Sequence, residues 1–581
     1  MLAYSRHYRC CATCGPLLRT TAVSVSDPAR SRWVTPRPCT RGTTEVTITE
    51  FSAGRKRARV CCSGEMPDEA GRLAFRRRGY ELEPYAGRFR SPSELAVTDS
   101  VIISQDADRL KEIYRALQRH APTLLNFDCR VYVRVAAAGR QLQGRERTTV
   151  VDAIRRLRLP GAGLTRAEWS TLASDQRERE KLPLAPYVYI CHSSWTWEDI
   201  AQVIAGNPAG EPPNLDLSVD AVDAKGKKIK VPRERWLLLS RAFPDCNAVH
   251  LRKMQDGLSG GSVYRAYAEV KGVEGTWPAT YFVKMGSRTK IATEYDHYQT
   301  HALKYIPFNL APRLALDRCG LGAREGVIVG DFVEHAEALK DCASSGRAID
   351  AIGTLFSRTL GAWRNAARTD DVRSLPQALS YLLPDNIDIP DERKALIRSL
   401  GGTPDLAHIR ELLDRCDAKP ILIGTIHGDL NASNVLVRFS DAILIDFKQL
   451  NEGRPLLYDA ASVEVGLLVD GFATDRRDVQ EWLTSIERLY DSHEMFECRI
   501  PCHPQDPSAW FFDCVRQVRL HARQLELKKG QYATALGLAF VKKSCNAHMF
   551  YDRRDTLRAA AYLLGERILE FVVAEYSKEI L

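Results

Sequence analysis

The chain has no run of about 18 uncharged apolar residues, so its sequence predicts no membrane-spanning helix. It also lacks the apolar core of a secretory signal near its start. Its 16 cysteines are scattered, mostly singly in apolar contexts such as Ile190-Cys191, and form no disulfide framework. We therefore expect a cytoplasmic protein with reduced thiols and no membrane contact.

Net positive charge is nearly absent outside the first 60 residues, although the net charge of the whole chain is +9. Those residues hold eleven Lys or Arg against three Asp or Glu, which leaves about +1 for the rest of the chain. This argues against a broad nucleic-acid-binding face, so we expect no nucleic-acid partner. Residues 1–65 are instead predicted to be a disordered basic tail. The alternatives are sequence upstream of a start at Met66, a targeting segment or a metal site on its cysteines.

One short segment, from His427 to Asp446, contains the residues best suited to catalysis. The sequence H-G-D-L-N-A-S-N, which begins at His427, places Asp429 and Asn434 on a tight loop. A short apolar strand at 442–445 then leads to Asp446. One carboxylate can position and deprotonate a hydroxyl, while an amide and a second carboxylate can hold Mg²⁺ against the phosphates of ATP. The spacing therefore favours metal-assisted phosphoryl transfer. The alternative is a β-hairpin with a solvated polar loop.

The pattern H-G-D-L-x-x-x-N, followed by an apolar strand and I-D-F, resembles the aminoglycoside phosphotransferase and choline kinase family over residues of about 246–581. The resemblance implies an α+β, two-lobed protein-kinase-like fold with a small β-rich lobe and a large helical lobe. It implies that Asp429 is the catalytic aspartate and that Asn434 and Asp446 are the metal ligands. His427 and Asp459 would brace the loop without taking part in the chemistry.

Three upstream features follow in the order that a kinase needs. Gly257, Gly260 and Gly261 form a glycine-rich loop, which can approach phosphates closely because no Cβ intervenes. Lys284 lies in a strand-like run, and Glu294 follows in a helical run at 290–303. A Lys–Glu pair would direct the ammonium at the α- and β-phosphates of ATP. Alone, each feature has an ordinary reading, a hairpin turn or a solvent-facing lysine, but their joint order supports a nucleotide site.

The β-branched run at 326–329 predicts the strand that becomes the hinge between the lobes in this fold. The backbone of a hinge reads the adenine edge, so we place adenine near Val329 and Phe332. ATP is the expected nucleotide, and GTP remains open. Cys498 and Cys502, with histidines nearby, form a second candidate metal site for which chance clustering is the alternative.

The chain divides by pattern into four parts. Residues 1–65 are the tail, 66–245 a mixed α/β accessory domain, 246–335 the β-rich lobe and 336–581 the helical lobe. The accessory domain carries no recognisable chemistry, and the hypotheses for it are sensing or the docking of a protein partner. Within it we predict strands at 101–104, 130–136 and 187–191, helices at 106–120, 148–157 and 196–205, and a hairpin at 215–231 around Lys225-Gly226.

The segment after Asp446 bears on the acceptor. It reads D-F-K with no glycine, and no Ser, Thr or Tyr lies between Phe447 and Leu457, so it offers no phosphorylation switch. This favours a small-molecule acceptor over a protein. Residues 459–497 hold ten Asp or Glu against three Arg, which suits a cationic acceptor or, more plainly, a solvated acidic helix face.

The sequence thus predicts an ATP- and Mg²⁺-dependent phosphotransferase that uses an alcohol group as acceptor, with Asp429 orienting the hydroxyl. The alternative is a nucleotide-binding signalling or conflict-system module, either a pseudokinase or a protein kinase acting on a partner. The large accessory domain motivates this alternative, and the joint presence of Lys284, Asp429, Asn434 and Asp446 argues against lost catalysis.

Overall fold

The computed structural model describes residues 57–85, 89, 91–106, 110–136, 188–191, 195–254, 261–272, 275–416, 419–471, 478–490 and 505–579. The helix expected at 148–157 and the cluster around Cys498 and Cys502 lie outside these residues. Among the described helices, none combines the length and apolar character needed to cross a membrane. The described cysteines are all free thiols.

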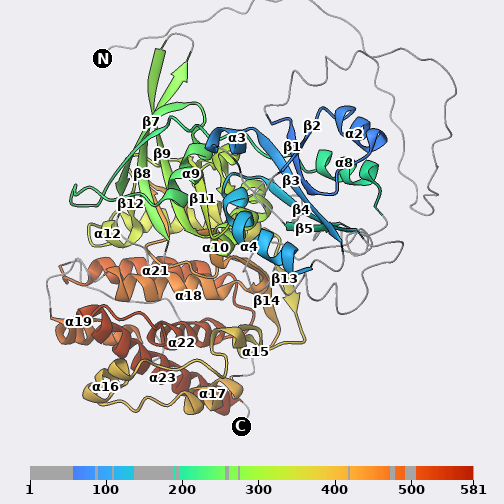
Figure 1. Cartoon of the computed structure of the whole chain (residues 1–581). Helices are drawn as coiled ribbons and strands as arrows, with labels where there is room; N and C mark the ends of the chain where they lie inside the picture. Colours follow the sequence, from blue (N-terminus) through green and yellow to red (C-terminus); the bar gives the residue numbers. More distant parts are fainter. Residues whose placement is uncertain are drawn as a thin grey trace, which may run out of the picture. The chain divides into compact units, whose positions relative to one another are not determined.

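A five-stranded parallel sheet forms the first domain (Figure 1). Its strand order is β2-β1-β3-β4-β5. The strands are β1 (Arg59–Gly64), β2 (Glu81–Pro84), β3 (Thr98–Asp106), β4 (Arg130–Ala136) and β5 (Val188–Cys191). The helices are α2 (Glu69–Arg76), α3 (Pro92–Ala96), α4 (Leu110–Asn126) and α8 (Trp197–Ala205). The strands and helices predicted over the described part of this domain are therefore confirmed, with shifted ends.

Helices cover both faces of this sheet because successive side chains of a strand point to opposite sides. Ile103 of β3 lies in one core cluster with Leu117 of α4. Its neighbour Ile102 lies in another cluster with Phe75 of α2 and Ile200 of α8. The sheet is thus buried on both sides, as an all-parallel sheet requires.

The predicted disordered tail at 1–65 ends too late. β1 (Arg59–Gly64) is an inner strand that pairs with both β2 and β3. Arg57 is also buried, and its guanidinium donates hydrogen bonds to the carbonyls of Phe127 and Glu211, both at 2.6 Å. The run R-V-C-C-S-G is short and follows a basic stretch, so its apolar residues did not stand out as a strand.

A chain that begins at Met66 tests this correction. Such a chain lacks β1, so β2 and β3 lose the strand between them and expose unpaired backbone groups to association. We expect insoluble protein, or soluble protein without a cooperative thermal transition for this domain. Circular dichroism and calorimetry against the full chain measure the effect. A Met66-start protein with the wild-type melting profile would refute the assignment of β1.

A six-stranded sheet follows, in the order β10-β11-β9-β8-β7-β6. Its strands are β6 (Ser218–Val222), β7 (Cys246–Lys253), β8 (Ser262–Gly272), β9 (Gly275–Ser287), β10 (Gly320–Leu321) and β11 (Glu325–Asp331). The accompanying helices are α9 (Arg233–Ala242), α10 (Arg288–His297), the π-helical turn η2 (Tyr298–Ala302), α11 (Leu303–Tyr305) and the short 3₁₀ turns η3 (Phe308–Leu310) and η4 (Leu316–Arg318). We call residues 218–338 the β-rich lobe.

The hairpin expected at 215–231 is not a hairpin of two full strands. A tight turn forms at Gly226, but the only antiparallel contact across it in this described stretch is the isolated bridge between Val222 and Lys228. β6 instead pairs in parallel with β7, from Ser218 opposite Ala248 to Val222 opposite Arg252. β6 precedes the predicted boundary at 245/246 yet belongs to the sheet of the β-rich lobe.

Helices dominate the remainder, residues 339–579, which we call the helical lobe. In Figure 1, α18 and α21 lie side by side, and α22 and α23 pack together below them. The helices are α12 (Leu339–Ala343), α13 (Ala348–Thr354), η5 (Leu355–Thr359), α14 (Gly361–Asn365), α15 (Leu375–Leu379), η6 (Ser380–Leu382), α16 (Asp391–Ser399), α17 (Leu406–Asp414), η7 (Phe447–Gln449), α18 (Leu457–Val469), α19 (Val479–Ile486), η9 (Glu487–Leu489), α21 (Ala509–Arg523), α22 (Gln531–Ser544) and α23 (Arg553–Glu579). A β-rich lobe followed by a helical lobe is the protein-kinase-like organisation expected.

Two small sheets, made of strands of the helical lobe apart from β12 at the end of the β-rich lobe, position the loop that begins at His427. Their orders are β12-β15-β16 and β13-β14-β17. The strands are β12 (Glu337–Ala338), β13 (Arg368–Asp370), β14 (Ile421–Ile426), β15 (Val435–Arg438), β16 (Asp441–Leu444) and β17 (Asn451–Pro455). The loop runs from the end of β14 to the start of β15, and Asp446 follows the end of β16.

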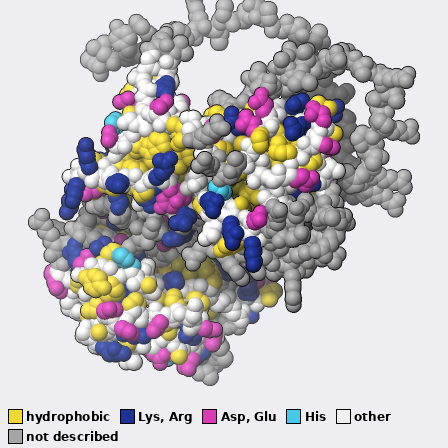
Figure 2. Space-filling view, in the orientation of Figure 1, with side chains coloured by type: hydrophobic (Ala, Val, Ile, Leu, Met, Phe, Trp, Pro, Cys, Tyr) yellow, Lys and Arg dark blue, Asp and Glu magenta, His cyan; other side chains and the backbone are white. Residues whose placement is uncertain are grey.

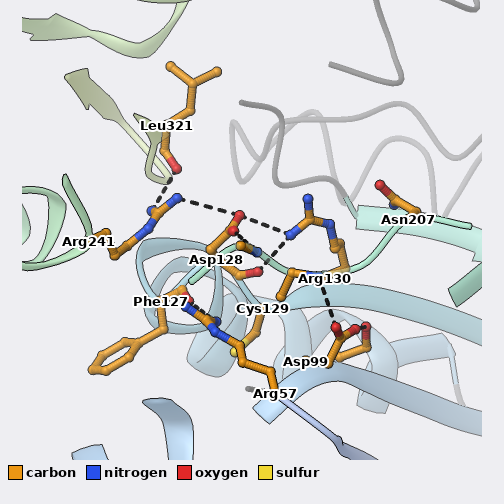
Figure 3. A network of polar contacts seen from close by, with 12 residues as sticks. Arg57, Asp99, Phe127, Asp128, Cys129, Arg130, Asn207, Arg241 and Leu321 are labelled. Carbon is orange, nitrogen blue, oxygen red and sulfur yellow. Dashed lines mark hydrogen bonds and ion pairs between the residues drawn. The ribbon is translucent and has the colours of Figure 1, made fainter. Parts of the chain in front are cut away.

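Buried charges join the parallel-sheet domain to the β-rich lobe (Figure 3). Asp128 follows α4 with a φ of 63° and lies 3.0 Å from Arg130 Nη1 and 3.5 Å from Nη2 of Arg241 on α9. Arg241 Nη1 also donates to the Leu321 carbonyl at 2.9 Å. Burial alone would raise the pKa of Asp128, but the neighbouring arginines outweigh burial and lower that pKa. Asp128 is therefore ionised at neutral pH.

On the face drawn in Figure 2, the Lys and Arg side chains are interspersed with Asp and Glu. Acidic and basic groups also form exposed pairs at the surface, such as Arg347 with Glu337 at 2.6 Å. This face therefore carries mixed charge.

Candidate active site

Lys284, Glu294 and Asp446 meet, although they come from three different elements. Lys284 lies on β9 and Glu294 on α10, which follows β9 directly. Lys284 Nζ lies 2.6 Å from Glu294 Oε2 and 3.0 Å from Asp446 Oδ1. The strand, the helix and the loop after β16 thus bring one cation between two carboxylates. The pair of Lys284 with Glu294 was predicted, whereas the contact of Lys284 with Asp446 was not.

The ammonium of Lys284 is buried, with 8% of the residue exposed. Burial alone would lower its pKa, but the charges of Glu294 and Asp446 outweigh burial and raise that pKa. Lys284 is therefore charged at neutral pH. Burial raises the pKa of Glu294 to about 7, although the charge of Lys284 opposes the shift. With both carboxylates ionised the group of three would carry a net charge of −1, which a divalent cation can offset.

His427 and Asp459 hold residues 427–434, which we call the catalytic loop after the role that the resemblance implies for Asp429. The carboxylate of Asp459, on α18, accepts hydrogen bonds from His427 N at 2.7 Å and from Gly428 N at 3.0 Å. His427 Nε2 donates to the Ile445 carbonyl at 3.0 Å. Gly428 has a φ of 77°, and a Cβ there would lie 2.3 Å from Gln449 O, so only glycine fits. His427 and Asp459 therefore brace the loop, as the resemblance implied.

Asp429 is exposed, and two amides hold it in place. Asn431 Nδ2 donates to Asp429 Oδ1 at 3.1 Å, and Asn434 Nδ2 donates to the Asp429 carbonyl at 2.8 Å. Because Asn434 uses its amide nitrogen in this way, its Oδ1 is the atom left to accept a cation. The Ile445 amide donates to the Asn434 carbonyl at 3.0 Å, which ties this loop to the residue before Asp446.

Asp446 occupies a left-handed backbone conformation with a φ of 64°. This conformation turns the chain into η7, so that Phe447 becomes buried against Tyr298 and His427. His297 Nδ1 lies 2.9 Å from the Phe447 carbonyl and links the same segment to α10. Lys448 follows Phe447, so the segment has no flexible glycine at this position. It nevertheless folds as a tight turn.

The structure describes some, but not all, of the other residues predicted to bind the nucleotide. Gly257 and Gly260 lie outside the described residues, and Gly261 begins the segment that enters β8. Val329 is on β11, where its amide contacts Cys319 Sγ and its carbonyl accepts from Ala315 N. Both backbone groups of Val329 are thus used within the lobe. Phe332 follows β11 and stacks under the Arg265 guanidinium at 4.5 Å.

Asn431 and His297 are the two site residues that sequence reasoning missed. Asn431 falls two residues after Asp429, inside the quoted pattern, and its amide was the available signal. His297 lies on α10 one turn after Glu294, and the sequence predicts only Glu294 as a site residue of this helix. Its contact with the Phe447 carbonyl spans 150 residues, so no local pattern indicates it.

Three carboxylates of the acidic segment at 459–497 serve the structure. Asp459 braces the catalytic loop, Glu464 pairs with Arg519 at 2.7 Å, and Asp470 pairs with Lys543 at 2.7 Å. These described carboxylates already have cationic or amide partners within the protein. They therefore give no support to a cationic acceptor.

A family model described as Ternary complex associated domain 9 matches residues 406–541. That range is less than half of the chain and contains the catalytic loop and Asp446. No curated protein matches the chain.

Several solved structures are similar to the chain. An aminoglycoside phosphotransferase from Streptomyces rimosus is 17% identical and covers 50% of this chain and 99% of its own, with a TM-score of 0.29. A thermostable mutant aminoglycoside phosphotransferase, solved with ADP and hygromycin B, is 13% identical over 57% of this chain and 96% of its own, with a TM-score of 0.30. An ethanolamine kinase from Plasmodium vivax is 12% identical over 54% and 81%, with a TM-score of 0.30.

Similarities at these TM-scores carry no argument about activity.

Proposed function

We propose that this protein is an ATP- and Mg²⁺-dependent phosphotransferase that transfers the γ-phosphate to a hydroxyl of a small molecule. The observation that supports it best is Lys284, held between Glu294 and Asp446. A lysine fixed by a helix glutamate and set beside a loop aspartate is the arrangement that kinases use to grip the α- and β-phosphates.

The donor set fits a magnesium ion. Asp446 offers carboxylate oxygens, and Asn434 offers its Oδ1 because its amide nitrogen is used on Asp429. Oxygen ligands of this kind suit Mg²⁺, which keeps several waters and shares the phosphates of a nucleotide. When bound, the ion neutralises charge on the transferring phosphoryl group. Lys284, oriented by Glu294, would hold the α- and β-phosphates, with Gly261 and the backbone near Phe332 beside the nucleotide.

Asp429 is the group that meets the acceptor. Its carboxylate is exposed, and Asn431 Nδ2 donates to Oδ1 at 3.1 Å. Oδ2 accepts a long hydrogen bond of 3.5 Å from Asn434 Nδ2, and its second lone pair can accept a hydrogen bond from an incoming hydroxyl. Asp429 would orient that hydroxyl for in-line attack on the γ-phosphorus. It would take the proton late, because a loose transition state needs little base strength.

The segment after Asp446 supports a small acceptor. η7 and β17 fill the whole interval to α18, and β17 pairs with β14 at Ile423–Pro455 and Gly424–Arg454. This leaves no long segment for a protein substrate to lie against between Asp446 and Leu457, all of which the structure describes. A protein kinase acting on a partner is thereby disfavoured.

Thermal unfolding of the wild type and of Asp446→Ala, each with and without Mg-ATP, tests the nucleotide site. A ligand at 100 times its Kd stabilises the folded state by about 2.7 kcal/mol, so we expect a clear rise in the Tm of the wild type. Asp446→Ala should blunt or abolish that rise. The same titration with Mg-GTP decides between the two nucleotides.

Asp441→Ala is the matched control, because Asp441 begins the strand that precedes Asp446 but pairs with Arg358 at the surface. It should keep the wild-type response to Mg-ATP. Absence of a Tm rise in wild type and both variants would contradict the proposal and favour a nucleotide-free interaction module.

A further inference from the structure

The backbone on both sides of Asp446 is held by histidines that belong to different lobes. The carbonyl of Ile445, the residue before it, accepts a hydrogen bond from His427 Nε2 at 3.0 Å. The carbonyl of Phe447, the residue after it, lies 2.9 Å from His297 Nδ1. His427 belongs to the helical lobe, and His297 belongs to α10 of the β-rich lobe. Both lobes therefore contact the backbone around one candidate metal ligand.

The hydrogen bond from His297 has only one possible direction. A carbonyl oxygen can only accept, so Nδ1 of the ring carries the proton. The same oxygen of Phe447 also accepts from the Leu450 amide at 3.2 Å, which closes η7. The carbonyl thus has one partner within the turn and one from the other lobe. The peptide unit after Phe447 is held from outside the turn as well as from within it.

The conformation of Asp446 explains why such support matters. Its φ of 64° and ψ of 69° lie in the left-handed region, which residues with a Cβ adopt uncommonly. Conformations of this kind persist at functional sites when the surrounding structure holds them. A change of φ or ψ here would turn the carboxylate away from its present direction. Hydrogen bonds to the carbonyls on either side oppose that change.

The same face of α10 also holds the side chain of Asp446. Glu294 and His297 are three residues apart on this helix, and residues at that spacing are neighbours on its surface. Glu294 pairs with Lys284, whose Nζ lies 3.0 Å from Asp446 Oδ1. The glutamate therefore acts on the carboxylate through the lysine, while the histidine acts on the backbone through the Phe447 carbonyl. A displacement of α10 would disturb both.

We propose that His297 is a positioning residue that sets the direction of the Asp446 carboxylate toward the metal ion. It acts through the backbone after Asp446, not by contact with the ion. This inference rests on the proposed function, because it concerns the metal that the phosphotransferase would use. Groups that orient a metal ligand usually change metal affinity or activity about 10- to 100-fold when they are removed.

Calorimetric titration with AMP-PNP, an ATP analogue that is not hydrolysed, tests this role when it is done with excess Mg²⁺ and again with EDTA. The Kd without metal divided by the Kd with metal gives the contribution of the ion. We expect His297→Ala to lower this ratio toward one, by about 10- to 100-fold, with little change in the Kd without metal. His297→Asn should restore the ratio, because its amide nitrogen takes the place of Nδ1.

His301→Ala is the matched control. His301 lies four residues after His297, on η2, and its Nδ1 lies 3.3 Å from Glu452 Oε1. The side chain of Glu452 is mostly exposed, so this contact contributes little, and it does not involve the backbone next to Asp446. Both alanine variants remove a half-buried imidazole. A lower ratio in His297→Ala alone therefore cannot come from a general loss of stability.

A double variant shows whether His297 acts through Asp446. In Asp446→Ala the ratio should already be low, and the addition of His297→Ala should lower it no further. An unchanged ratio in His297→Ala, an equal fall in His301→Ala, or no recovery in His297→Asn would overturn the inference and leave the proposed function intact. A wild-type ratio of one would contradict the proposed function itself, and the inference with it.

Discussion

Asp429→Asn is expected to lower the rate of phosphoryl transfer by about 10²- to 10⁴-fold, the usual contribution of a positioned general base. The substitution keeps the shape of the side chain and its hydrogen bond with the neighbouring Asn431, but it removes the negative oxygen that would orient the acceptor. Nucleotide binding should persist, because Lys284, Asn434 and Asp446 are unchanged. Two assays measure the effect: ADP release with water as acceptor, and incorporation of labelled γ-phosphate into the small molecules of a cell extract.

A matched carboxylate elsewhere controls for this change. Asp441→Asn removes a charge from β16, close in sequence to the site, where Asp441 contacts Asn309 and Arg358 at the surface. It should leave the rate of transfer unchanged. Wild-type activity in Asp429→Asn would exclude this aspartate from the chemistry. Label that enters a protein instead of a small molecule would favour the protein-kinase alternative.

Asp128→Asn is expected to destabilise the fold by about 3–5 kcal/mol, the range for breaking a buried ion pair by removing one partner. Asn tolerates the left-handed backbone at this position, so the substitution removes the charge without adding backbone strain. Arg130 and Arg241 would remain buried without their common carboxylate. Chemical denaturation at pH 7 measures the free energy of unfolding.

The same pair of proteins makes a pH-dependent prediction. The folded-state pKa of Asp128 is lowered, so its contribution to stability is complete above the unfolded-state value of about 3.9 and is lost as the pH falls through the folded-state value. The difference in stability between wild type and Asp128→Asn should therefore shrink only below about pH 4. Glu337→Gln, which breaks an exposed pair with Arg347, should cause no measurable change at any pH. Equal losses in both variants would contradict a special role for the buried cluster.

The kinase-like part was predictable because its chemistry depends on short spacings. Lys284 and Glu294 are ten residues apart on a strand and the helix that follows it, so their pairing follows from local structure. Asp429 and Asn434 lie five residues apart in one short loop between β14 and β15. Spacing does not reveal partners that are distant in sequence: Val329 was predicted to present its backbone to a nucleotide, yet Ala315 and Cys319 already use those groups.

The parallel-sheet domain was harder to read for a related reason. β1 has only a short apolar run after a basic stretch, and what makes it a strand is its position between β2 and β3. β6 was predicted as half of a hairpin because Lys225-Gly226 is a strong turn signal, and the turn does form at Gly226. Its actual partner is β7, which follows α9, and local turn chemistry cannot indicate a parallel pairing across a helix.

The position of β6 bears on how such a chain can be assembled from parts. β6 forms the outer edge of the six-stranded sheet, and its only sequence link to β7 runs through α9. A recombination event that joined a new upstream domain at residue 246 would remove β6. β7 would then be an edge strand with unpaired backbone groups that can pair with other chains. The structural unit that contains Lys284 and Asp446 therefore begins before Ser218. Exchanges of the upstream domain that preserve a working protein must cross over on the N-terminal side of that strand.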